Sequence, residues 1–154
     1  MIKINVILGN IYWKKYIKNP LNFIDTKLDK LNKKNKLYKK NIFICSLLLS
    51  GEKEIKKLNK KFRNKNKSTD VLSFPFYKKS QLRKKIKIEK EIYLGDIIIN
   101  LNMIKSKNNK IKFKDELNKL WIHGLVHLFG FKHKKDKDYY SMQKIEKSYL
   151  DYIN

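Results

Sequence analysis

The chain is poor in cysteine, proline and glycine, with one, two and five of each in 154 residues. A single cysteine excludes a disulfide within the chain, and Cys45 lies in an apolar run, where we expect a buried thiol. No apolar stretch approaches the ~20 residues that a helix needs to cross a bilayer, and the amino terminus lacks a signal-peptide pattern. We therefore predict a single cytoplasmic domain over residues 1–154, with a core that needs no disulfide.

Acidic residues and arginine are also scarce. The 38 lysines and arginines outnumber the 14 aspartates and glutamates, so the formal net charge is +24. Such an excess favours a polyanionic partner, most simply nucleic acid. Only Arg63 and Arg83 are arginines, however, and a surface selected for phosphate geometry would contain more of them. The charge therefore supports a nucleic-acid partner but does not establish one, since much of the lysine can form a solvated surface.

Histidine is rare too, and all three histidines lie within residues 123–133. Four residues advance an α-helix by about 400°, so His123 and His127 would project from one face, roughly 6 Å apart along the axis. Gly130 can end the helix in the left-handed conformation and turn the chain, so that His133 supplies a third nitrogen. This pattern predicts a metal site with three protein ligands and an open position, which is typical of catalytic zinc.

Zinc is the favoured ion, with one Zn²⁺ per chain. Neutral imidazole is a poor ligand for calcium or magnesium, whereas nickel or another transition metal also fits this ligand type. The alternative to metal binding is a structural role for the histidines, because a histidine on an apolar helix face is often a hydrogen-bonded core residue.

The residue beside the first histidine decides which reaction such a metal would serve. The motif H-E-x-x-H places there the glutamate that acts as general base in metallopeptidases, but this chain has Gly124. A peptidase would lack its proton acceptor, so phosphodiester cleavage is the better candidate. A divalent cation and one guanidinium can stabilise the charge of its transition state. Arg63 is the candidate guanidinium, and the alternative is a helix-end arginine that binds the last carbonyls.

Hydrophobic periodicity predicts strands mixed with helices, which indicates an α+β fold. Pro75 places the third strand at a sheet edge or terminus, and Gly95 predicts a bulge in the fourth. The mostly charged segment 77–90 is predicted to be a mobile excursion. The predicted strands cover 2–8, 42–49, 71–76 and 92–99, and the predicted helices begin after Asn19, cover about 51–63, run from Phe113 through His127, and surround Met142–Tyr149.

Several separated segments together resemble the YbeY family of bacterial rRNA maturation endoribonucleases. Residues 123–133 (HGLVHLFGFKH) are similar to its H-G-x-L-H-L-x-G-Y-D-H signature. Residues 58–63 (LNKKFR) and 69–75 (TDVLSFP) are similar to L-N-x-x-Y-R and T-D-V-L-S-F-P. Residues 94–97 (LGDI) and 142–146 (MQKIE) are similar to L-G-D-I and M-x-x-L-E and follow in the family's order. The combination is far more specific than any one motif.

The resemblance implies a mixed four-stranded sheet packed with helices and a zincin-like metal-site helix. It implies zinc bound by His123, His127 and His133, and a functional role for Arg63. It also implies cleavage of single-stranded RNA in 16S rRNA 3′-end maturation and ribosome quality control, with ribosomal RNA and the small ribosomal subunit as partners. Whether hydrolysis or attack by a 2′-hydroxyl cuts the strand stays open.

One position departs from the family pattern. Lys132 replaces the aspartate before the third histidine, so a possible negative neighbour of the metal becomes positive. A second hypothesis is therefore a non-catalytic, basic ribosome-assembly factor whose metal only stabilises the fold. Glu146 is interpreted as a surface or packing carboxylate, with a hydrogen bond to a ligating histidine as the alternative. We expect Asp70 to fix the turn that it forms with Thr69.

Overall fold

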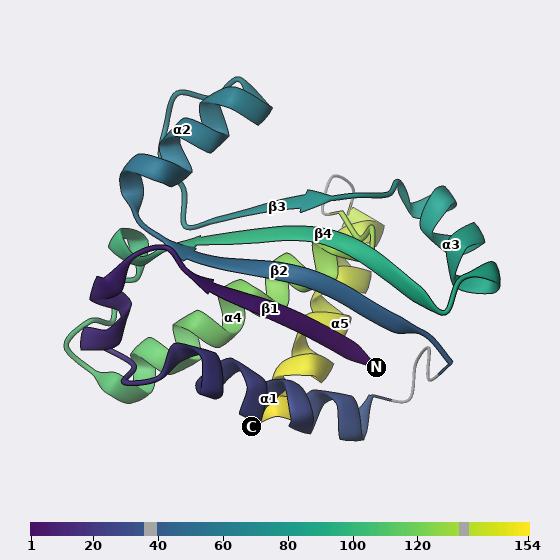
Figure 1. Cartoon of the computed structure of the whole chain (residues 1–154), viewed down its shortest axis with the longest axis horizontal. Helices are drawn as coiled ribbons and strands as arrows, with labels where there is room; N and C mark the ends of the chain where they lie inside the picture. Colours follow the sequence, from purple (N-terminus) through teal and green to yellow (C-terminus); the bar gives the residue numbers. More distant parts are fainter. Residues whose placement is uncertain (36–39, 133–135) are drawn as a thin grey trace.

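A mixed sheet forms the centre of the molecule (Figure 1). The computed structural model describes residues 1–35, 40–132 and 136–154. The sheet that these residues form has four strands in the order β1-β2-β4-β3. β1 pairs with β2 and β2 with β4 in parallel, whereas β3 pairs antiparallel with β4. This confirms the predicted α+β fold with a mixed sheet. The strands are β1 (Ile2–Leu8), β2 (Ile42–Ser50), β3 (Val71–Pro75) and β4 (Glu91–Asn100).

Helices lie on both sides of the sheet. Helices α1, α4 and α5 lie together on one side, and α2 lies apart from them at one end of the sheet (Figure 1). In the described parts of the chain, no helix has both the length and the apolar character to cross a membrane. The helices are α1 (Pro20–Lys34), α2 (Glu52–Arg63), α3 (Lys79–Ile88), α4 (Lys110–Leu128) and α5 (Asp136–Ile153), with short 3-10 helices η1 (Ile11–Lys15) and η2 (Leu101–Met103).

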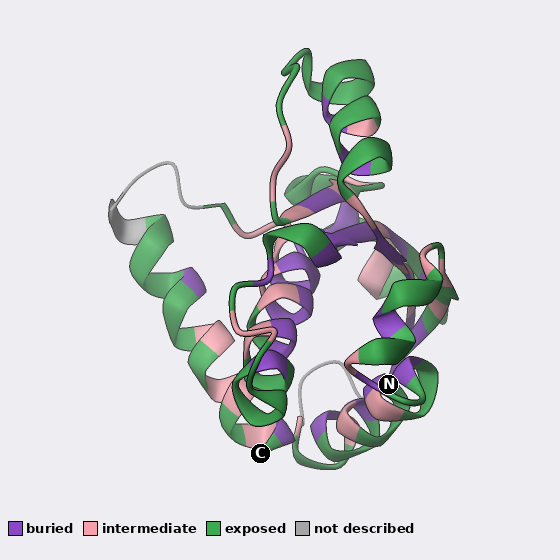
Figure 2. Cartoon of the chain, turned by 90° about the vertical axis from the view of Figure 1, so that its left-hand side faces the viewer, coloured by how far each residue is buried: buried purple, intermediate pink, exposed green. Residues whose placement is uncertain are grey.

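The alternation of side chains explains how the sheet is buried. Ile2 and Ile4 of β1 are buried and the intervening Lys3 is exposed, as expected of an edge strand with one solvated face. In the central strand β2, Cys45 and Leu47 are fully buried. Burial raises the pKa of the Cys45 thiol to about 12, so this cysteine is an inert core residue, as predicted. Figure 2 shows buried residues in the sheet and in the helices beside it, with exposed residues on the outer sides.

The predicted bulge at Gly95 is present. The β2–β4 register shifts between Ile44 and Cys45, and Gly95 has a φ of +130°. A Cβ atom at Gly95 would lie 2.1 Å from the carbonyl oxygen of Phe74 on the neighbouring strand β3. Any side chain here would therefore separate the two strands.

The segment that follows β3 differs from the prediction. Residues 79–88 form helix α3, and the prediction of a mobile excursion over 77–90 is wrong. Leu82 is 3% exposed and belongs to the main core, and the side chain of Gln81 accepts a hydrogen bond from the backbone N–H of Lys78. The burial of one leucine and a local cap orders a segment whose composition indicates only solvation.

Candidate functional site

Helix α4 carries the histidine pair along the side of the core. Asn109 caps the helix by accepting hydrogen bonds from the backbone N–H groups of Ile111 and Lys112. From Trp121 to Phe129 every residue is buried except His123 and His127, which are partly exposed. The two imidazoles therefore lie at the margin of a buried helix, where a ligand can reach them.

The two imidazoles face each other through their Nε2 atoms, which lie 3.0 Å apart. The rings are nearly perpendicular, with an interplanar angle of 88° and a centroid separation of 4.5 Å. The Nδ1 atom of His123 lies 2.7 Å from Oε1 of Glu146, and the Nδ1 atom of His127 lies 2.8 Å from the backbone carbonyl oxygen of Phe131. Both rings are thus held in position from their outer nitrogens.

This arrangement suits a cation between the rings. A carbonyl oxygen and a carboxylate oxygen accept hydrogen bonds, so each Nδ1 carries the proton and each Nε2 carries a lone pair in the neutral ring. Two lone pairs that face each other repel unless a proton or a metal ion lies between them. Two nitrogens bound to one tetrahedral zinc, each at 2.0–2.1 Å, lie about 3.3 Å apart, close to the spacing seen here.

Glu146 comes to the site from helix α5. Its side chain is 23% exposed, and that of His123 is 34% exposed. The sequence favours a surface or packing carboxylate here, whereas the structure supports the alternative, because the carboxylate contacts His123 directly. The sequence signal was limited to the position of Glu146 in a motif of the last helix, since the contact joins residues 23 positions apart.

Gly124 lets α4 approach the sheet closely. A Cβ atom at this position would lie 2.6 Å from Cγ2 of Ile97 in β4 and 3.1 Å from Oγ of Ser73 in β3. The glutamate of an H-E-x-x-H motif therefore does not fit here while the helix keeps its place. The absence of this glutamate counts against the peptidase alternative on steric as well as chemical grounds.

Arg63 contacts the edge strand next to this helix. Its Nη2 atom donates a hydrogen bond of 3.0 Å to the carbonyl oxygen of Ser73, and its guanidinium carbon lies 5.8 Å from the centre of the Phe74 ring. The contact seen is thus with β3, instead of the helix-end carbonyls of the alternative interpretation. The same Ser73 packs against Gly124, so one residue of β3 contacts both Arg63 and the helix that carries the histidine pair.

The match to a protein family spans nearly the whole chain. Residues 10–154 match the family described as Endoribonuclease YbeY. The chain belongs to the endoribonuclease YbeY family. The resemblance predicted from the separated motifs is confirmed, and the matched region also includes η1 and α1, where the sequence showed no motif.

Relatives and a solved structure agree with this. An Endoribonuclease YbeY of Pelagibacter ubique is 47% identical over 148 residues, which cover 95% of this chain and 92% of that protein. An Endoribonuclease YbeY of Ehrlichia canis is 34% identical over 151 residues, 92% of this chain and 89% of that protein. The solution structure of TM1509 from Thermotoga maritima has a TM-score of 0.61 and 27% identity, covering 98% of this chain and 89% of that one.

The third histidine of the YbeY signature, His133, lies outside the described residues. Gly130, which precedes it, has a φ of +86°, so the predicted left-handed turn after α4 is confirmed. Within the described residues no group of three or more histidines, cysteines, aspartates or glutamates could hold a metal ion. The three-histidine ligand set therefore stays a prediction.

Helix α3 packs against this turn. A Cβ atom at Gly130 would lie 3.0 Å from Cβ of Lys79, and the Lys79 ammonium lies 4.6 Å from the centre of the Phe131 ring. Since the Phe131 carbonyl accepts the hydrogen bond of His127, Lys79 adds positive charge beside the site. The sequence gives no signal for this contact, because the mostly charged segment 77–90 predicts a mobile excursion.

Asp70, by contrast, has the structural role predicted for it. Its Oδ1 atom accepts hydrogen bonds from the backbone N–H of Val71 and from the hydroxyl of Thr69. The side-chain amide of Asn100 also donates to the carbonyl oxygen of Thr69. These bonds fix the loop that leads into β3 and so position Ser73.

Substitution of Gly124 by alanine tests the close approach of α4. In an open helix this change stabilises, because alanine has the higher helix propensity. Here the added methyl group meets Ile97 and Ser73, so we expect a loss of about 1–3 kcal/mol in the free energy of unfolding. Denaturant unfolding measures it, with exposed Lys119→Ala in the same helix as control. An increase in stability for Gly124→Ala would show that the helix does not need this contact.

Proposed function

We propose that this protein is a metal-dependent endoribonuclease that cleaves single-stranded RNA. Membership of the endoribonuclease YbeY family supports the endoribonuclease activity. The observation that carries metal dependence is the pair of Nε2 atoms 3.0 Å apart, each on a ring anchored through Nδ1. The proposed ligands of one Zn²⁺ are His123, His127 and, by its place in the sequence motif, His133.

The described residues fit a zinc ion, since neutral imidazole nitrogens with hydrogen-bonded outer nitrogens are the usual zinc ligands in proteins. When bound, zinc supplies a Lewis acid that polarises a phosphoryl oxygen or lowers the pKa of water. Glu146 and the Phe131 carbonyl hold the rings in the tautomer that directs Nε2 inward. Arg63 has one N–H on Ser73 and an exposed side chain, so its remaining donors can bind the charge that develops on the phosphoryl group.

The proposed substrate is ribosomal RNA in 16S 3′-end maturation and ribosome quality control, with the small ribosomal subunit as partner and the cytoplasm as location. The net charge of +24 supports an RNA substrate. Lysines such as Lys79 beside the site would bind backbone phosphates without selecting bases. Single-stranded RNA suits a site of this kind because its backbone can bend toward a metal ion next to a helix.

Cleavage of single-stranded RNA by the purified, zinc-loaded protein tests this proposal. We expect His127→Ala to abolish cleavage, because it removes a ligand, and Arg63→Ala to reduce kcat by about 10²–10³-fold, because it removes a donor to the transition state. Arg83→Ala is the matched control, since Arg83 is the other arginine of the chain and is exposed on α3. Equal cleavage by all four proteins would indicate a contaminating nuclease and contradict the proposal.

A non-catalytic ribosome-assembly factor with a structural metal is the second candidate. Lys132 favours it, because a positive residue stands where the family motif has aspartate. Chelation separates the two candidates. A catalytic metal predicts that a chelator abolishes cleavage while the melting temperature changes little, whereas a structural metal predicts a sharp fall in the melting temperature. A large fall without any cleavage beforehand would favour the assembly factor.

Glu146→Gln tests whether the carboxylate supports a metal site. The substitution keeps the shape of the side chain but removes its charge, so the Nδ1–H of His123 loses a strong acceptor. We expect zinc affinity to fall about 10- to 100-fold with the fold unchanged. Competition titration against a coloured chelator measures it, with Glu91→Gln, an exposed glutamate at the start of β4, as control. Unchanged affinity would mean that Glu146 serves packing alone.

A further inference from the structure

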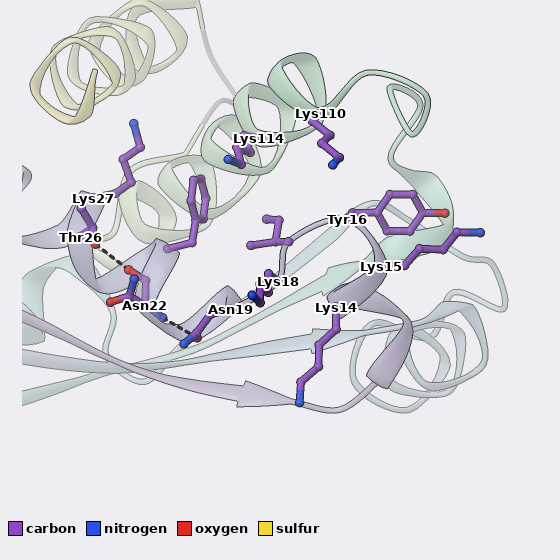
Figure 3. A pocket seen from close by; sticks show the side chains of 12 residues that line it. Lys14, Lys15, Tyr16, Lys18, Asn19, Asn22, Thr26, Lys27, Lys110 and Lys114 are labelled. Carbon is purple, nitrogen blue, oxygen red and sulfur yellow. Dashed lines mark hydrogen bonds between the residues drawn. The ribbon is translucent and has the colours of Figure 1, made fainter.

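A second polar site lies at the other end of helix α4. A pocket of about 480 Å³ opens between η1, the start of α1 and the first turns of α4 (Figure 3). Its floor contains Ile17 and Phe23, and its rim carries the polar side chains of Asn19, Asn22 and Thr26. None of the lining residues is acidic. Six of them are lysines, namely Lys14, Lys15, Lys18, Lys27, Lys110 and Lys114.

The lysines come from both sides of the pocket. Figure 3 shows Lys14, Lys15 and Lys18 on the segment that precedes α1, and Lys110 and Lys114 on α4 opposite them. The Lys114 ammonium lies 5.8 Å from the centre of the Phe23 ring, which holds it over the pocket. Two segments about 90 residues apart in sequence therefore both contribute positive charge to this pocket.

This positive charge is only partly compensated. Lys27 donates a hydrogen bond to the carbonyl oxygen of Ile153. Burial lowers the pKa of Lys27, and the charges of Lys30 and Lys114 lower it further, against the opposing effect of Asp115. The ion pairs formed between described residues, Lys85 with Glu89 and His123 with Glu146, lie elsewhere. An anion bound in the pocket would reduce the repulsion between these lysine ammonium groups.

The chemistry of the pocket fits a phosphodiester backbone. Five of its six lysines are exposed, so their ammonium groups can move to meet phosphates but cannot impose the planar geometry that arginine gives. Several positive charges around one pocket match a ligand that carries one negative charge per nucleotide. Side-chain amides and a hydroxyl add hydrogen bonds to phosphate or sugar oxygens, and none of these groups is arranged to read a base.

The pocket is separate from the histidine pair. Thirteen residues separate Lys110 from His123, which places them about 20 Å apart along the helix axis. Nine residues separate Lys114 from His123, so these side chains project from opposite sides of α4, about 180° apart. With its bases stacked at about 3.4 Å per nucleotide, a six-nucleotide strand covers about 20 Å, which is too short to follow the helix and also pass around it, whereas an RNA of several tens of nucleotides can reach both places.

We propose that this pocket is a second RNA contact, which binds backbone phosphates of a segment outside the stretch that is cleaved. The inference rests on the proposed function for the identity of the substrate. Long RNA would then be held at two places, and the pocket would raise affinity without taking part in cleavage. The pocket lysines lie outside the motif segments 58–63, 69–75, 94–97, 123–133 and 142–146.

The test compares two triple variants that remove the same charge. Lys18→Gln/Lys110→Gln/Lys114→Gln changes the pocket, and Lys84→Gln/Lys87→Gln/Lys90→Gln changes exposed lysines at α3 and the start of β4. Metal-free protein is titrated with a structured RNA of several tens of nucleotides and with a six-nucleotide RNA, at several salt concentrations. Melting curves verify that both variants are folded.

We expect the pocket variant to bind the long RNA at least tenfold more weakly and to lower the salt slope by about 2, because each phosphate contact contributes about 0.7–0.9. The control variant should change the affinity for the long RNA less than about threefold. The pocket variant should lose less affinity for the six-nucleotide RNA than for the long RNA, because only the long RNA is held at both places at once. The single-turnover cleavage rate at saturating RNA should be unchanged in the pocket variant.

Equal losses in both variants would show diffuse attraction and overturn the proposal, as would unchanged binding of the long RNA by the pocket variant. A pocket variant that binds RNA normally but no longer binds phosphatidylserine vesicles would identify a membrane contact instead. Failure of the proposed function is distinguishable, because a protein that never cleaves RNA could still lose RNA binding through the pocket lysines alone.

Discussion

The close approach of helix α4 to strands β3 and β4 is the constraint on which the site depends. At Gly124 the sheet leaves no room for even one methyl group, so the helix is held against Ile97 and Ser73 at the point where it carries His123. The same Ser73 accepts a hydrogen bond from Arg63. One backbone contact therefore sets the position of the imidazoles and of the guanidinium relative to a common strand. A bulkier residue at 124 would disturb both groups through the same displacement.

The histidine pair depends on partners that hold it from outside. Glu146 of α5 and the Phe131 carbonyl after α4 direct both Nε2 atoms inward, and Lys79 of α3 packs on the turn that presents this carbonyl. Three elements that are distant in sequence thus support two rings on one helix. Because each ring is fixed by a hydrogen bond at Nδ1, little conformational entropy is left to lose when a ligand binds at Nε2. This preorganisation is what distinguishes the pair from two chance neighbours on a helix.

Basic side chains lie near both ends of helix α4. Near the carboxyl end of α4, Arg63 contacts the edge strand β3 and Lys79 packs on the turn that follows the helix. At the far end of α4, lysines gather around a pocket with an apolar floor. Both groups are connected by the same helix, since α4 carries the histidines near its end and Lys110 and Lys114 near its start. A single rigid element would therefore connect the proposed RNA contact at one end to the proposed metal site at the other.

Local pattern determined much of this protein. Alternating side chains predicted β1, a continuous apolar run predicted β2, and Pro75 predicted that the third strand lies at an edge or ends there. Helical spacing predicted that His123 and His127 share a face, because such periodicities follow from backbone geometry alone. Tertiary structure decided the rest. From the sequence, Gly124 is only a missing glutamate, Glu146 is first a surface or packing carboxylate, and the segment of Lys79 is a mobile excursion. The actual role of each residue depends on a neighbour from another element. Periodicity specifies which way a side chain points along its own helix or strand, and only the packing of those elements decides what it meets there.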